Sequence, residues 1–177
     1  MELFVGTVNS REELKGILAL QKQNLPDKLS KEERKTEGFV TVSHTMELLQ
    51  RMNNVCPHII AKDKDKVVGY TLCMHPGFAD EIPVLQPMFK EINKVLPKEK
   101  KFMVMGQVCI DKSYRKQGVF GRLYQAMKKT IQPEFDSIIT EVDALNVRSL
   151  NAHYAVGFYD LKKYHSLGQD WHLLIWE

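Results

Sequence analysis

A short basic turn between two apolar segments carries the clearest potential for chemistry in this chain. Arg115, Lys116 and Arg122 supply three cations, and Gly118 and Gly121 lie among them. Glycine lets the backbone approach an anion closely, and the first turn of a helix offers free N–H groups and a positive dipole end. The combination predicts a phosphate site, most naturally for the pyrophosphate of a cofactor. The alternative is an ordinary solvated basic turn.

The segments on either side of this turn must position it. Residues 102–110 are rich in Val, Met, Phe and Ile, which is typical of a buried strand. After the glycines, apolar residues recur at steps of three or four until Pro133 ends the helical pattern. The common nucleotide loops GxxxxGK[ST] and GxGxxG are absent from the turn. The sequence therefore predicts a strand, a turn and a helix that bind phosphate in a different way.

Two motifs connect the chain with a known family. The run from Arg115 to Gly121, RKQGVFG, resembles motif A, (Q/R)xxGx(G/A), of the GNAT superfamily of acyl-CoA-dependent N-acyltransferases. Phe120 stands where that motif usually has Gly or Ala. About 30 residues later, the run from Asn146 to Phe158 resembles motif B of the same family, N-x-x-(A/S)-x-x-x-(Y/H)-x-x-x-G-F. Both motifs occur in the family's order, and the resemblance extends over nearly the whole chain.

The resemblance implies acetyl-CoA as the co-substrate, bound between the central strand and the strand before motif B. Pantetheine would bond to strand backbone at Val108 and Ile110, and the pyrophosphate would lie on the amides of the motif A turn. The residues that the resemblance assigns to acetyl-CoA are Val108, Cys109, Ile110, Arg115, Lys116, Gln117, Gly118, Val119, Phe120, Gly121, Arg122, Asn146 and Ser149.

Direct attack of an amine on a thioester requires an acid that protonates the leaving thiolate. His153 stands where the family often has a tyrosine acid, and a histidine pKa near 6.5 suits this role. Tyr154 is the adjacent candidate acid, although helical spacing assigns it to the core side with Val147 and Leu150. The alternative for His153 is a hydrogen-bonded helix residue without a proton role.

The base that deprotonates the amine is less evident. Some family members use a glutamate on the central strand, where this chain has Val104. Glu141 and Asp143, on the strand before motif B, are the nearest substitutes and share one face. We expect Glu141 to act as the base, the alternative being an ion-paired surface carboxylate. Gln107, polar within an apolar strand, either faces the acceptor or stabilises a bulge.

Length and composition favour a single domain over residues 1–177, with an insertion at about 75–101 before the central strand. The net charge of +3 is too small to argue for nucleic acid, and no strand shows interleaved aromatic and basic residues. Three scattered cysteines predict reduced core thiols. Without a signal-like or membrane-spanning run, a cytoplasmic protein that contacts no membrane is expected. The histidines and cysteines show no metal-binding spacing.

The predicted fold is α/β (α+β), a GNAT-like, mixed but mostly antiparallel central sheet of six to seven strands flanked by helices, with an inserted helical segment before the central strand. Charged residues 27–38 either border the acceptor site or form a solvated connection. Strands are expected at 2–8, 58–62, 67–74, 102–110, 137–144, 158–165 and 170–176, and helices at about 10–24, 45–52, 84–95, 118–132 and 147–156.

The resulting functional prediction is an N-acetyltransferase that moves an acetyl group from acetyl-CoA to a primary amine of a small molecule or peptide. A non-catalytic acyl-CoA-binding or sensing domain is the alternative. Valine in place of the strand glutamate favours the alternative, whereas the polar face of Asn146, Ser149 and His153 favours the enzyme. The resemblance also makes a homodimer possible.

Overall fold

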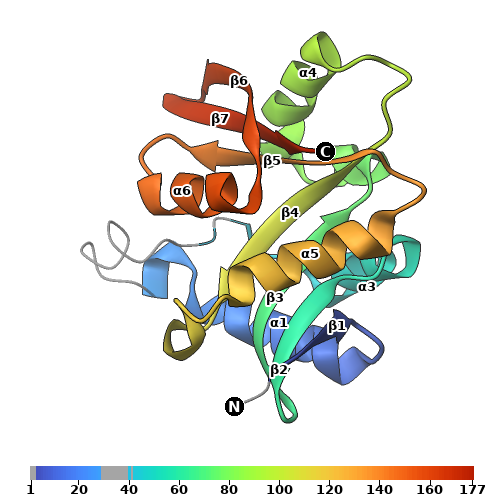
Figure 1. Cartoon of the computed structure of the whole chain (residues 1–177), viewed down its shortest axis with the longest axis vertical. Helices are drawn as coiled ribbons and strands as arrows, with labels where there is room; N and C mark the ends of the chain where they lie inside the picture. The colour runs from blue at the N-terminus through green and yellow to red at the C-terminus, as the bar shows by residue number, and fades with distance from the viewer. Residues whose placement is uncertain (1–2, 29–39, 41) are drawn as a thin grey trace. The chain divides into compact units, whose positions relative to one another are not determined.

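The computed structural model describes residues 3–28, 40 and 42–177. Its strands are β1 Phe4–Thr7, β2 Ile59–Asp63, β3 Lys66–Met74, β4 Phe102–Ile110, β5 Ser137–Asp143, β6 Tyr159–Ser166 and β7 Gln169–Trp176 (Figure 1). Its α-helices are α1 Arg11–Gln23, α3 Met46–Val55, α4 Gln86–Val95, α5 Val119–Ile131 and α6 Val147–Val156. Short 3₁₀ helices are η1 Pro26–Lys28, η2 Pro76–Glu81, η3 Pro83–Leu85 and η4 Lys112–Tyr114.

The seven strands form one sheet in the order β1-β2-β3-β4-β5-β7-β6. The pairs β1–β2, β2–β3, β5–β7 and β7–β6 are antiparallel. The pair β4–β5 is parallel and runs from Phe102 opposite Ser137 to Val104 opposite Ile139. This mostly antiparallel sheet, with helix α4 inserted before β4, confirms the predicted fold class.

The chain divides into two compact units, with boundaries after Cys73, after Val104 within β4, and after Thr130. The first unit is Met1–Cys73 with Met105–Thr130, and the second is Met74–Val104 with Ile131–Glu177.

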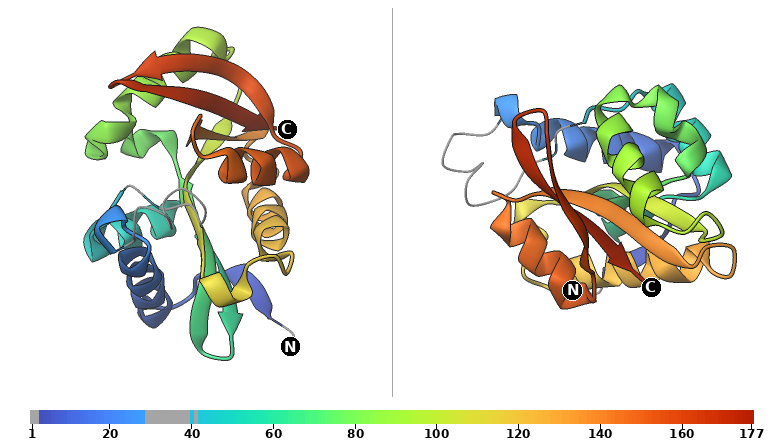
Figure 2. Two further views of the ribbon diagram at one scale, coloured as in Figure 1. Left: turned by 90° about the vertical axis from the view of Figure 1, so that its left-hand side faces the viewer. Right: turned by 90° about the horizontal axis from the view of Figure 1, so that it is seen from above.

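In the first unit, α1 and α3 cover one face of the strands and α5 covers the other (Figure 2). The buried side of α1, which includes Leu14 and Ile17, packs with Leu49 of α3 and Tyr70 of β3. Gly16 brings α1 unusually near the sheet, because a Cβ at this position would lie 2.6 Å from the Val67 side chain. This helical spacing of apolar residues is what fixes the layers of the first unit.

In the second unit, α4 and α6 lie on opposite sides of the strands β5, β7 and β6 (Figure 2). Lys162 of β6 forms an ion pair of 2.5 Å with Glu91 of α4, which joins the helix of the insertion to the hairpin. Phe78, Met88 and Phe89 of the insertion are buried. They therefore pack the insertion.

Local sequence signals set several element ends. Ser10 caps α1 by accepting a hydrogen bond of 3.2 Å from the Glu13 amide, as its S-x-x-E pattern predicts. The Glu13 carboxylate bonds to the Asn9 amide at 2.7 Å, one residue earlier than in a standard capping box. Gly157 ends α6 in the left-handed region with φ of 120°. The prediction for residues 27–38 lies outside the described residues apart from η1.

No helix in the described part of the chain is long and apolar enough to cross a membrane.

Candidate active site

The turn between β4 and α5 has a backbone conformation that few sequences adopt. The Asp111 carboxylate accepts a hydrogen bond of 3.0 Å from the Ser113 amide and starts the turn. Lys116 and Gly118 then take φ values of 61° and 74°, so two of three consecutive residues are left-handed. Glycine adopts this region without the steric cost of a Cβ, whereas lysine does so with strain. Helix α5 begins directly afterwards at Val119, which is buried.

The outer surface of this turn suits a phosphate. A Cβ built at Gly118 or Gly121 meets no atom within 4 Å, so the backbone faces open space at both positions. The first turn of α5 lies here with its helix amides, and the exposed Lys116 adds a cation. The exposed backbone therefore leaves room for an anion at this turn, and the pyrophosphate contact stays a prediction.

Arg115 and Arg122 have other contacts in the structure. The Arg115 guanidinium donates from Nε to the Ile110 carbonyl at 2.9 Å and from Nη2 to Asn24 Oδ1 at 3.2 Å. Arg122 donates from Nη2 to the Leu3 carbonyl at 2.7 Å. Both side chains thus brace the turn against other parts of the first unit, in addition to the charge they bring.

Strand β4 alternates along its last residues. Val108 and Ile110 are half-buried, whereas Gln107 and Cys109 are buried. Burial raises the pKa of the Cys109 thiol to about 12, although the nearby Arg115 works to lower it. Cys109 is therefore a neutral core residue at physiological pH. All three cysteines are buried free thiols, as predicted.

Gln107 belongs to a buried polar group, which we call the Gln107 cluster: Gln21, His44, Tyr70 and Gln107. Gln107 Oε1 accepts hydrogen bonds from the Tyr70 hydroxyl at 2.6 Å and from Gln21 Nε2 at 2.7 Å. Gln107 Nε2 donates to the Val42 carbonyl at 2.8 Å. Gln21 Nε2 also lies 2.9 Å from His44 Nδ1, and burial lowers the pKa of His44 to about 4. The cluster is therefore neutral and internally satisfied at pH 7.

Sequence reasoning missed three members of the Gln107 cluster. The available signals were a polar residue within the apolar strand and Gln21 on the apolar face of its helix. Neither pattern identifies a partner, because Gln21 and Gln107 are 86 residues apart.

In motif B, Asn146 caps α6 by accepting a hydrogen bond of 3.2 Å from the Ser149 amide. His153 is only 1% exposed, and its ring packs edge-on against Phe158. His153 Nδ1 lies 2.7 Å from the Ser149 carbonyl, so this nitrogen carries the proton. Burial lowers the pKa of His153 to about 4, despite this hydrogen bond.

The predicted faces of α6 are wrong. Val147 and Tyr154 were assigned to the core side, but they are 58% and 37% exposed. The buried side consists of Leu150 and His153. Leu150 and His153 are three residues apart, so the buried stripe is centred between them rather than between Leu150 and Tyr154.

Tyr154 belongs to a polar group of the second unit. Its hydroxyl donates a hydrogen bond of 3.1 Å to Asp160 Oδ1 and lies 3.1 Å from His172 Nδ1. Asp160 Oδ1 is in turn 2.8 Å from His172 Nδ1. Partial burial and the bond to Asp160 raise the pKa of Tyr154. Asp160 and His172 were not identified from the sequence.

Glu141 of β5 is half-buried. Its Oε2 accepts a hydrogen bond from the hydroxyl of Tyr164 on β6. Burial raises the pKa of Glu141 to about 7, while the bond from Tyr164 works in the opposite direction. Asp143, the other candidate, instead accepts a hydrogen bond of 2.8 Å from the Leu145 amide in the next turn.

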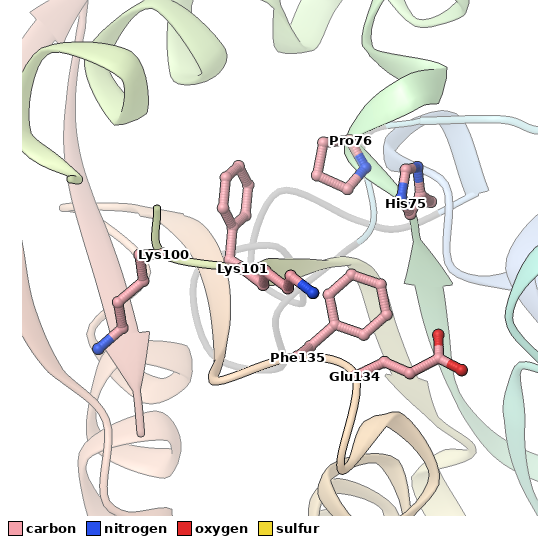
Figure 3. Close-up of a pocket in the computed structure, with 7 residues that line it drawn as sticks. His75, Pro76, Lys100, Lys101, Glu134 and Phe135 are labelled. Carbon is pink, nitrogen blue, oxygen red and sulfur yellow. The ribbon is translucent and has the colours of Figure 1, made fainter. Parts of the chain in front are cut away.

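A separate pocket of about 520 Å³ lies in the second unit. In Figure 3, His75 and Pro76 stand on one side, Glu134 and Phe135 on the other, and Lys101 extends toward the Phe135 ring. Its lining residues are His75, Pro76, Lys100, Lys101, Phe102, Glu134 and Phe135. None of them is a predicted site residue. Over the described ranges, no three His, Cys, Asp or Glu side chains are grouped to hold a metal ion.

The family model described as "Acetyltransferase (GNAT) family" matches residues 22–158, more than half of the chain. A search of curated protein sequences finds no match. Among solved structures, the fold is similar to a chain of the NatC complex bound to Gag peptide and CoA, with a TM-score of 0.67, 17% identity, and 99% and 98% of the two chains covered.

Two further solved structures are similar. Ard1 from Thermoplasma volcanium has a TM-score of 0.65 and 13% identity, over 99% of this chain and 97% of that one. The putative acetyltransferase yncA from Salmonella typhimurium, solved with acetyl-CoA, has a TM-score of 0.64 and 9% identity, over 100% and 94%.

The family model over residues 22–158 defines the class of the protein as an acetyltransferase. The chain belongs to the GNAT acetyltransferase family. It is an N-acetyltransferase.

Proposed function

We propose that this enzyme transfers the acetyl group directly from acetyl-CoA to a primary amine of a small molecule or peptide, with Glu141 as the general base. The observation that carries the proposal is the state of the Glu141 carboxyl. Burial raises its pKa to about 7, so a substantial part is ionised at neutral pH and accepts a proton readily. A base with a pKa near the working pH is the most effective one.

For acetyl-CoA we propose the residues that the motifs indicate. The amides from Gln117 to Gly121, with Lys116, would hold the pyrophosphate, and the backbone of Val108 and Ile110 would bond pantetheine. The exposed backbone at Gly118 supports this part of the proposal. Cys109, Arg115, Val119, Phe120, Arg122, Asn146 and Ser149 complete the proposed set.

We propose Tyr154, rather than His153, as the acid. The amine nitrogen bonds to the thioester carbon, Glu141 takes the amine proton, the C–S bond breaks, and the thiolate receives a proton. Nδ1–H of His153 is bonded to a carbonyl, and a pKa near 4 leaves the other ring nitrogen unprotonated at pH 7. Tyr154 is partly exposed and keeps its hydroxyl proton at neutral pH, and it would exchange its hydrogen bond to Asp160 for one to the thiolate.

The acid assignment is tested by two single variants under saturating acetyl-CoA. Tyr154→Phe should lower kcat by roughly 10²-fold, the usual scale for general acid catalysis. His153→Gln keeps a polar side chain at this buried position and should change kcat much less than Tyr154→Phe does. The reverse order would make His153 the acid. Thermal melts of both variants separate lost chemistry from lost folding.

The nature of the acceptor is part of the proposal. Similar folds include a complex bound to a peptide and a spermidine N-acetyltransferase chimera, so both peptide and polyamine amines belong in a test panel.

A cytoplasmic location is supported by the free thiols. We also propose that residues 1–177 form one domain with an insertion at about 75–101. We further propose that the protein is a homodimer.

The decisive experiment measures thiol release from acetyl-CoA over a panel of polyamines, amino acids and peptide N-termini. We expect turnover with at least one amine, and a loss of roughly 10²-fold or more in kcat for Glu141→Gln. Asp143→Asn is the matched control on the same strand and should stay near wild type. Glu141→Gln with full activity would contradict the base assignment. Tight binding of acetyl-CoA without any turnover would instead favour the non-catalytic binding domain.

A further inference from the structure

Tyr164 contacts Glu141 across an intervening strand. The sheet order β5-β7-β6 places β7 between the two residues. Glu141 is opposite Leu173 of β7, and Leu173 is opposite Lys162 of β6, two residues before Tyr164. Residues two apart on a strand share a face, so Tyr164 extends diagonally over β7 to place its hydroxyl on the carboxylate. Such a contact fixes both side chains, because each must keep one rotamer.

The surroundings of Tyr164 keep its hydroxyl a donor. Partial burial and the nearby carboxylates of Glu141 and Glu91 raise the pKa of Tyr164 well above its usual value. Its hydroxyl thus stays protonated over the neutral range. Glu91, on α4, is itself compensated by Lys94 at 2.6 Å and Lys162 at 2.5 Å.

A hydrogen bond donated to a carboxylate favours its ionised form. Burial has the opposite effect on Glu141, and it is the stronger of the two. Tyr164 therefore limits how far burial suppresses ionisation of this carboxyl. It also leaves Oε1 as the oxygen that does not take part in this contact.

We propose that Tyr164 is a positioning residue for the base, which orients the Glu141 carboxylate and eases its ionisation. This inference rests on the proposed role of Glu141. Tyr164 does not exchange a proton with the substrate in this scheme.

Tyr164→Phe tests the inference because it removes one oxygen and keeps the ring. Without the donor, Glu141 ionises at higher pH, so the acidic limb of the pH profile of kcat/KM should move upward by about one pH unit. The KM for acetyl-CoA should stay unchanged. A role of the ring in packing alone would lower stability without moving this limb.

Tyr159→Phe is the matched control. Tyr159 lies on the same strand, and its hydroxyl also donates to a carboxylate, Glu177 Oε2 at 2.5 Å. This contact does not involve Glu141, so the pH profile of the variant should coincide with that of the wild type.

A second measurement does not depend on turnover. Carbon-13 NMR of glutamate-labelled protein should show one carboxyl resonance that titrates near pH 7 and is missing from Glu141→Gln. In Tyr164→Phe this midpoint should rise by about one unit. If Glu141→Gln is inactive but Tyr164→Phe changes neither the midpoint nor the acidic limb, the inference is wrong and the base assignment stands. If Glu141→Gln is fully active, the base assignment fails and this inference fails with it.

Discussion

The Gln107 cluster of the first unit and the Glu141–Tyr164 pair of the second use the same kind of contact. In each, a tyrosine hydroxyl donates to a side-chain oxygen on a strand, Tyr70 to Gln107 and Tyr164 to Glu141. The two acceptors differ in how they respond to pH. The Gln107 amide is neutral at every pH, whereas the Glu141 carboxyl titrates. The first arrangement can therefore only hold structure, while the second can also move a proton.

The largest expected effect on stability comes from breaking the Gln107 cluster. Gln107→Leu removes the acceptor of the Tyr70 hydroxyl and the donor to the Val42 carbonyl, and it leaves Gln21 with its contacts to His44. Each buried polar group that loses its partner costs about 1–3 kcal/mol, so the free energy of unfolding should fall by about 3 kcal/mol. Urea unfolding measures this loss. Gln125→Leu, on the exposed side of α5, is the control, and an equal loss there would show that the cluster has no special role.

A change in the Glu141–Tyr164 pair should affect stability in a way that depends on pH. The folded pKa of Glu141, about 7, lies above the ordinary value of a glutamate. Its contribution to stability is thus present below about pH 4.5 and is lost as pH rises through 7. Glu141→Gln cannot ionise, so its melting temperature should rise relative to wild type between pH 5 and pH 8. A constant difference over this range would contradict the raised pKa.

The smallest effect is expected for Tyr70→Phe. The variant removes one hydrogen bond, but Gln107 Oε1 keeps its bond from Gln21. We expect a loss of about 1 kcal/mol in unfolding free energy, equal at pH 6 and pH 8, because no titrating group changes its partner. Denaturation at the two pH values checks this. A loss that grows with pH would show that the Gln107 cluster carries charge after all.

The order of elements was predictable because the signals for it are local. The spacing of apolar residues gave the strands and helices, and short patterns such as Ser10 with Glu13 or the terminal Gly157 gave their ends. The motif A turn was also predictable, since its shape depends on glycine and on neighbouring residues. The backbone of Gly118 lies open as expected.

The polar contacts were not predictable in the same way. Glu141 and Tyr164 are 23 residues apart, and only the strand order brings them together. The prediction of the buried side of helix α6 failed for a different reason. It has ten residues and few large apolar ones, so a shift of the apolar stripe by one position exchanges His153 for Tyr154. A short helix with a weak pattern does not define its own buried side.

The left-handed residue Lys116 has a consequence for how the motif A turn meets its ligand. A lysine held at φ of 61° is unfavourable in isolation, so the rest of the fold must impose this shape during folding. The bonds of Arg115 and Arg122 to backbone carbonyls are two of the constraints that do so. The pyrophosphate that we propose for this turn would then meet a preorganised backbone, and the entropy of ordering the loop would not oppose its binding.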